Sequence, residues 1–205
     1  MELNKLQQRT YEVILKTYGE RTKGYESEIK QIIITTSNLM SEMFKNKDIG
    51  ESITKTYYDS CLKNVRILYD ILEIIKPNEN VLEDEKTIYF ILIMYCQQCE
   101  AISFLFKDFV HKYINKSYTT MGDFVLVFKR KYPQYLDELF NKRFIPQLRN
   151  AVSHNQVVLD NTQKIIQYPE KSEIITLTFH QVVNLYDTLM MIYLAIVIEL
   201  TQPRA

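Results

Sequence analysis

The chain has 205 residues, of which 46% are hydrophobic and 24% charged, with only 4 glycines and 5 prolines, so its composition is that of a folded globular protein and not of a disordered chain. This length suffices for one sizeable core, and we predict a single domain over residues 1–205. Lys plus Arg balances Asp plus Glu at 25 each, so no net field draws the protein to nucleic acid or to an anionic membrane.

The sequence carries no pattern typical of a secreted or membrane-spanning protein. Its first residues, MELNKLQQRTYEV, lack a basic region followed by an apolar run, which is the pattern of a secretory signal. The most apolar stretch, MMIYLAIVIEL at residues 190–200, is about half as long as the ~20 residues needed to cross a bilayer. We therefore expect a cytoplasmic protein with no membrane partner.

Helical periodicity dominates the N-terminal part of the chain. Residues 3–18 and 26–44 have the apolar spacing of helices, and Gly19 and Gly24 mark an interruption between them. This pattern leaves open whether the segment is one bent helix or two. We treat residues 1–45 as an N-terminal helical extension of the domain.

A helical hairpin is expected next. The first apolar stripe stops at KPNEN, residues 76–80, where a loop is predicted. Asn80 and Glu83 then form a capping box that starts a long helix over residues 83–113. The first stripe consists of Leu62, Val65, Leu68, Leu72 and Ile75; the second consists of Ile88, Ile91, Tyr95, Ile102, Phe106, Phe109 and Tyr113.

The three cysteines, Cys61, Cys96 and Cys99, are too few for a disulfide framework in a chain of this size. The pair CQQC raises the alternatives of a redox motif or half of a zinc site. Neither is favoured, because the pair lies inside a helical pattern, no strand precedes it, and no second Cys or His pair follows at ligand spacing. We expect small buried side chains, and we predict no metal site and no cofactor.

The C-terminal half changes its period. A loop at residues 115–123 precedes a short helix over residues 124–131, and Pro133 suits the first turn of another helix. Residues 156–178 alternate as two or three short strands, and Thr178 with Gln181 caps a final helix that runs to about Leu200. The predicted fold is mainly all-α: an up-and-down helical bundle with a small β-hairpin inserted before its last helix.

The stretch LRNAVSHNQ, residues 148–156, groups polar residues that can act on a phosphodiester. Asn150 and His154, four residues apart, lie on nearly the same face of a helix, and Arg149 projects from an adjoining angle. A histidine can move protons between a ribose 2′-hydroxyl and a leaving oxygen, while an arginine holds the phosphate by paired hydrogen bonds. Asn150 can orient either group. These are the parts required for metal-free phosphodiester transfer within RNA.

The run RNAVSH, residues 149–154, resembles the motif of HEPN-domain proteins, in which an arginine and a polar residue precede a histidine by a few variable residues. The HEPN domain is also an up-and-down helical bundle. Small members commonly place a strand-like segment after the histidine and then a closing apolar helix, which is similar to the order of elements after Asn155. The similarity covers the motif and the arrangement of residues 60–200, but not the first 45 residues.

The resemblance implies a metal-independent endoribonuclease of the kind found among toxins of toxin-antitoxin systems and phage-defence proteins. Arg149 and His154 would be the catalytic pair, with Asn150 in support, and RNA would be the substrate. The family usually builds its cleft from two copies, which implies a homodimer, and an antitoxin or inhibitor protein is an expected partner. Two alternatives stay open: a non-catalytic HEPN-like bundle that binds nucleotide, RNA or a protein, and an unrelated helical protein in which LRNAVSH is only a helix end.

Two short basic runs precede the motif and are candidate contacts for RNA phosphates: Lys129 with Arg130, and Lys142 with Arg143. A solvated face is the simpler interpretation of each run, because the net charge is zero. The other histidines carry no motif. We expect His111 to be solvated and His180 to lie in a helix first turn. Tyrosines at helical spacing are expected in the core or at a dimer interface; they are Tyr69, Tyr89 and Tyr95.

Overall fold

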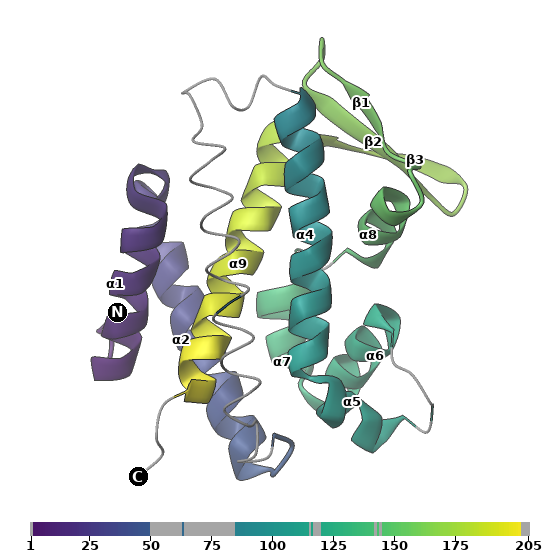
Figure 1. Cartoon of the computed structure of the whole chain (residues 1–205). Helices are drawn as coiled ribbons and strands as arrows, with labels where there is room; N and C mark the ends of the chain where they lie inside the picture. The colour runs from purple at the N-terminus through teal and green to yellow at the C-terminus, as the bar shows by residue number, and fades with distance from the viewer. Residues whose placement is uncertain are drawn as a thin grey trace.

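Two apolar helices form the centre of the molecule (Figure 1). They belong to a computed structural model that describes residues 2–49, 63, 85–114, 116, 120–141, 143 and 145–201. Helix α4 (Glu85–Leu105) packs against helix α9 (Phe179–Thr201), and helix α2 (Glu26–Lys45) covers another side of α9. Helix α1 (Lys5–Tyr18) packs against α2 and α9. Buried side chains from all four helices meet in one hydrophobic core.

Two separate helices form the N-terminal segment. Asn4 and Gln7 exchange hydrogen bonds in a capping box at the start of α1. A short 3-10 helix, Gly19–Thr22, follows, and both Gly19 (φ 51°) and Gly24 (φ 84°) have positive φ. The predicted interruption is therefore confirmed, because a residue with a side chain is strained in these conformations.

The prediction of one continuous helix over residues 83–113 is wrong. Helix α4 ends at Leu105, and a second helix, α5 (Lys107–Tyr113), begins after Phe106, whose φ of −102° and ψ of 11° are not helical. No Gly or Pro marks this break. Phe106 lies in an aromatic cluster, 5.1 Å from the ring of Phe128 and 5.7 Å from that of Phe124, so packing fixes the break. The predicted Asn80–Glu83 capping box and the stripe from Leu62 to Ile75 lie outside the described residues.

Helix α6 (Met121–Lys131) is the predicted short helix, and it starts three residues earlier than expected. Thr120 and Asp123 form a capping box there, which sequence periodicity did not reveal. Pro133 does occupy a first turn, in the short helix α7 (Pro133–Tyr135). A π-helical turn, Leu136–Phe140, continues from it and leads toward helix α8 (Pro146–Ser153).

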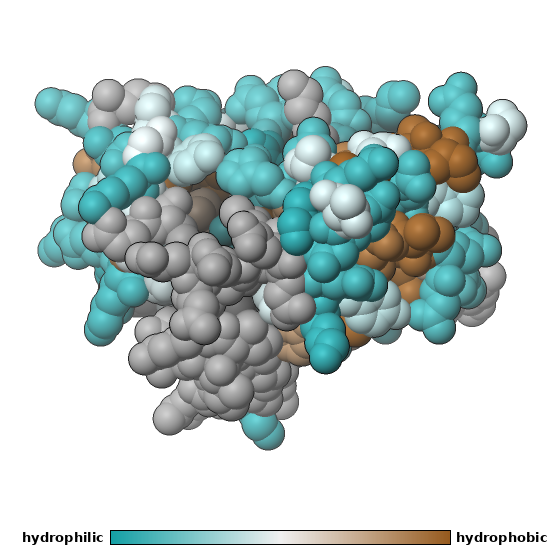
Figure 2. Space-filling view, turned by 90° about the horizontal axis from the view of Figure 1, so that it is seen from above, coloured by the Kyte–Doolittle hydropathy of each residue, from teal (hydrophilic) through white to brown (hydrophobic). Residues whose placement is uncertain are grey.

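The predicted β insertion is a three-stranded antiparallel sheet in the order β1-β2-β3. The strands are β1 (Val158–Asp160), β2 (Ile165–Glu170) and β3 (Glu173–Thr178). Alternation along β2 buries Ile166 and Tyr168 against the core. The opposite face carries Val158 and Ile174, which are 61% and 64% exposed, and hydrophobic groups reach the surface on this side of the molecule (Figure 2).

The closing helix starts where the sequence predicts. The Thr178 N–H donates to Gln181 Oε1 (2.7 Å), and the Gln181 N–H donates to Thr178 Oγ1 (3.1 Å). His180 lies in the first turn, as predicted. By length and composition, both α4 and α9 could cross a membrane, and α9 extends well beyond the apolar run at residues 190–200. More than half of the apolar window of each helix is buried inside the fold, so packing in the core accounts for its composition.

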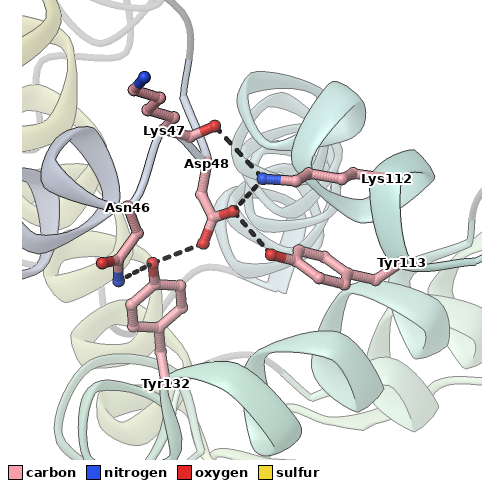
Figure 3. A network of polar contacts seen from close by, with 6 residues as sticks. All are labelled: Asn46, Lys47, Asp48, Lys112, Tyr113 and Tyr132. Carbon is pink, nitrogen blue, oxygen red and sulfur yellow. Dashed lines mark hydrogen bonds and ion pairs between the residues drawn. The ribbon is translucent and has the colours of Figure 1, made fainter.

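A polar network around the buried Asp48 joins the end of α2 to α5 and α6 (Figure 3). Asp48 accepts hydrogen bonds from Lys112 Nζ (2.7 Å), the Tyr113 hydroxyl (2.8 Å) and the Tyr132 hydroxyl (2.7 Å). Tyr132 in turn accepts from Asn46 Nδ2 (3.1 Å). Burial by itself would raise the pKa of Asp48, but the three donors outweigh it and hold that pKa below its ordinary value. The carboxylate therefore stays ionised and ties three elements together.

The prediction that His111 is solvated is wrong. It is half-buried on α5, and its Nε2 is enclosed without a hydrogen-bond partner among the described residues. Its expected exposure rested on the neighbouring Lys112, which does reach solvent, with 47% of its side chain exposed. Adjacent helical residues point about 100° apart, so one exposed lysine says little about the next position.

Candidate functional site

The motif occupies helix α8 and the turn that ends it. Pro146 stands in the first turn, where the absence of an N–H costs no intrahelical hydrogen bond. His154 is the C-cap, and Asn155 follows with a left-handed φ of 53°. The Asn155 N–H donates to the Val152 carbonyl (3.2 Å), and the Gln156 N–H donates to the Ala151 carbonyl (2.7 Å). This is a Schellman motif, with asparagine in the place that usually holds glycine.

One face of α8 is buried and the other carries the motif. Leu148, Ala151 and Val152 belong to the hydrophobic core. Asn150 and His154 are exposed, and the side chain of Arg149 is 31% exposed. The helix therefore presents all three predicted site residues at the surface, as the spacing of the motif indicates.

Helix α4 fixes the position of α8 through hydrogen bonds at both ends. The buried Tyr95 hydroxyl donates to the Arg143 carbonyl (2.9 Å) and accepts from the Ile145 N–H (2.8 Å), just before α8 begins. At the other end, the Tyr89 hydroxyl donates to Asn155 Oδ1 (2.8 Å). Tyr95 is in the core as predicted, whereas Tyr89 is half-buried and supports the turn after His154.

Arg149 makes an ion pair that the sequence did not predict. Its Nη2 donates to a carboxylate oxygen of Glu100 on α4, and its Nη1 donates to Asn150 Oδ1 (3.1 Å). The carboxylate is itself exposed, with 53% of the Glu100 side chain accessible. Glu100 lies 49 positions before Arg149 in the chain, so only the packing of α4 on α8 brings them together. The positive charge of Arg149 is thus compensated within the chain.

His154 stands apart from this pair. Its backbone N–H donates to the Asn150 carbonyl (3.0 Å), and the residue lies at the negative end of the helix dipole. Within the part of the chain that the structure describes, no hydrogen bond or ion pair joins its side chain to Arg149 or Asn150. A residue that only ended a helix would have these same features.

Helix α4 contacts the motif segment at two separate points. The guanidinium of Arg149 meets α4 at Glu100, whereas the residue after His154 meets it at Tyr89. Tyr89 and Glu100 are eleven positions apart on α4, which corresponds to roughly 16 Å along its axis. These two contacts therefore fix the motif segment to α4 near both of its ends.

The predicted RNA-contacting basic residues have different environments. Lys129 and Arg130 are exposed in the last turn of α6, where their charge complements the helix dipole. Arg143 is engaged, because its guanidinium donates to the Glu138 carbonyl (2.6 Å) and pairs with Glu28 (3.1 Å). Lys142 lies outside the described residues. Lys129 and Arg130 thus lie on α6, whereas Arg143 lies just before α8, so the three described residues belong to different elements.

Cys96 and Cys99 are held as thiols by their surroundings. Cys99 is fully buried, as predicted, while Cys96 is half-buried and its Sγ contacts the Arg149 carbonyl (3.8 Å). Burial raises the pKa of Cys96 to about 12 and raises that of Cys99 as well. Over the described ranges, no three His, Cys, Asp or Glu side chains gather in a way that could hold a metal ion.

Comparisons with protein families, with characterised proteins and with solved structures found no significant match to this chain.

Proposed function

We propose that the protein is a metal-independent endoribonuclease of the HEPN type that acts as a cytoplasmic homodimer, as a toxin or phage-defence effector. One observation carries the proposal: α8 presents Arg149, Asn150 and His154 to solvent immediately before a small sheet and a closing apolar helix. This order is the one that the resemblance of the RNAVSH run implies. RNA is the proposed substrate, and an antitoxin or inhibitor protein is a proposed partner.

The chemistry needs two groups that handle protons. One takes the proton of the ribose 2′-hydroxyl as its oxygen attacks the phosphorus; the other gives a proton to the departing 5′-oxygen. The products are a 2′,3′-cyclic phosphate and a 5′-hydroxyl end. Arg149 stabilises the charge that develops on the phosphoryl oxygens, because a guanidinium donates paired hydrogen bonds to phosphate.

A dimer supplies what one chain lacks. Each chain has one suitable histidine in the motif, and among the described residues its side chain makes no hydrogen bond with Arg149 or Asn150. Two copies facing each other across a twofold axis can bring His154 and the partner's His154 to one cleft, as base and acid. This one cleft is then shared between the copies, and neither copy is active alone.

The test incubates a mixed RNA pool with wild type, Arg149→Ala and His154→Ala in the presence of EDTA. The proposal expects cleavage by wild type only, with cyclic-phosphate ends. Circular dichroism and gel filtration on each variant check that fold and oligomeric state are unchanged. Intact RNA with folded wild type, or equal cleavage by all three proteins, would contradict the proposal.

Among the described residues, no hydrogen bond or ion pair links the His154 side chain to Arg149, and this favours a second candidate, a non-catalytic bundle that binds RNA or nucleotide through Arg149. In that case folded wild type binds a single-stranded oligonucleotide without cutting it, and Arg149→Ala weakens the binding while His154→Ala does not. The two candidates therefore differ in the effect of the histidine substitution.

A further inference from the structure

The ion pair between Glu100 and Arg149 lies on an exposed surface. Glu100 belongs to the solvent-facing stripe of α4, in which Ile93 and Phe104 are 36% and 52% exposed. Both terminal nitrogens of the Arg149 guanidinium are occupied, Nη2 by the Glu100 carboxylate and Nη1 by the Asn150 amide oxygen. An RNA phosphate that approaches this edge of the guanidinium meets a group of its own charge already bound there.

Glu100 is not needed to hold α8 in place. Leu148, Ala151 and Val152 anchor the helix in the core, and Tyr89 and Tyr95 bond to the two ends of the motif segment. An exposed ion pair adds little stability to such an assembly, since solvent screens it and two long side chains must be ordered. The pair can open without loss of the fold. The main effect of the ion pair is to compensate the positive charge of Arg149.

We propose that Glu100 is a built-in competitor for phosphate at Arg149: its carboxylate occupies the guanidinium in the resting chain, and RNA binds Arg149 by displacing it. This inference rests on the proposed function, because it takes an RNA phosphate as the ligand of Arg149. Glu100 then sets how tightly RNA binds at the motif. An RNA phosphate binds Arg149 only if the other contacts of the RNA hold it beside the guanidinium. The phosphate can then replace the Glu100 carboxylate.

The test measures binding of a 2′-O-methylated single-stranded oligonucleotide, which cannot undergo 2′-hydroxyl attack, by fluorescence anisotropy at several salt concentrations. The variants are Glu100→Gln, Arg149→Ala and the double variant. Glu12→Gln is the matched control, because Glu12 is an exposed carboxylate on α1 and the charge change is the same. Thermal unfolding of each variant confirms that it is folded.

Glu100→Gln is expected to bind about two- to fivefold tighter than wild type, the size expected when an exposed ion pair no longer competes. The slope of log K against log salt should be shallower by about 0.7 in Arg149→Ala than in wild type, because one fewer phosphate is neutralised. The gain must vanish in the double variant, and Glu12→Gln must match wild type. Unchanged or weaker binding by Glu100→Gln, or a gain that persists without Arg149, overturns the proposal.

Cleavage of unmodified RNA in EDTA separates this inference from the proposed function. If wild type cuts RNA but Glu100→Gln does not bind RNA more tightly, the proposed role of Glu100 is refuted and the proposed nuclease function stands. If Glu100→Gln binds RNA more tightly through Arg149 but neither wild type nor Glu100→Gln cuts RNA, the proposed role of Glu100 stands and the proposed nuclease function is refuted.

Discussion

Tyr95 is the residue whose substitution tests most directly how α8 is positioned. Tyr95→Phe keeps the buried ring and removes only the hydroxyl, which bonds the Arg143 carbonyl and the Ile145 N–H. Both backbone groups then lose their partner next to the start of α8. An unsatisfied buried group costs about 1–3 kcal/mol; because these two are only partly buried, we expect a total loss of about 2–3 kcal/mol in the free energy of unfolding.

Urea unfolding at neutral pH measures this loss. For an m-value near the upper part of the usual range, the midpoint should fall by about 1 M. Tyr25→Phe is the matched control, since Tyr25 is 42% exposed, and its midpoint should stay that of wild type. RNA cleavage by Tyr95→Phe should also fall, because the loop that starts α8 is no longer fixed. A Tyr95→Phe midpoint equal to that of Tyr25→Phe would refute the reasoning.

Two further substitutions test the polar network and the turn. The folded pKa of Asp48 lies below its ordinary value of 3.8, so its contribution is complete at neutral pH and is lost as the pH falls through the folded pKa. Asp48→Asn should therefore lower the urea midpoint at pH 7, and the difference from wild type should shrink in strong acid; a difference independent of pH contradicts this. Asn155→Ala should be less stable than Asn155→Gly by about 1 kcal/mol, because only alanine is strained at a φ of 53° and both variants lose the bond to Tyr89. Equal thermal midpoints of the two Asn155 variants would show that the left-handed turn is not retained.

Much of the fold follows from local sequence rules. Apolar periodicity places α1, α2 and α9 within a few residues of their observed bounds, and the exchange between Thr178 and Gln181 marks the start of α9. Alternation predicts the strands because one face of the sheet is buried. These signals depend on residues close together in the chain, which is why sequence alone reveals them.

Features set by distant contacts were not predictable. The break at Phe106 comes from aromatic packing against α6, and no residue nearby disfavours a helix. The motif spacing does place Arg149, Asn150 and His154 on the surface of α8. It does not show where the Arg149 side chain turns, because that depends on Glu100 in another helix. Local spacing thus identified the candidate residues, while their arrangement required the tertiary structure.

Mixed dimers test most directly whether two copies share one cleft, which is the central claim. Wild type and His154→Ala chains, each with a different tag, are co-expressed in equal amounts, and RNA cleavage in EDTA is measured per total protein. Random pairing leaves about a quarter of the dimers fully wild type. A cleft that needs both histidines predicts that activity falls to about this quarter. Activity of about one half would show that each chain carries an independent site, and it would contradict the shared cleft.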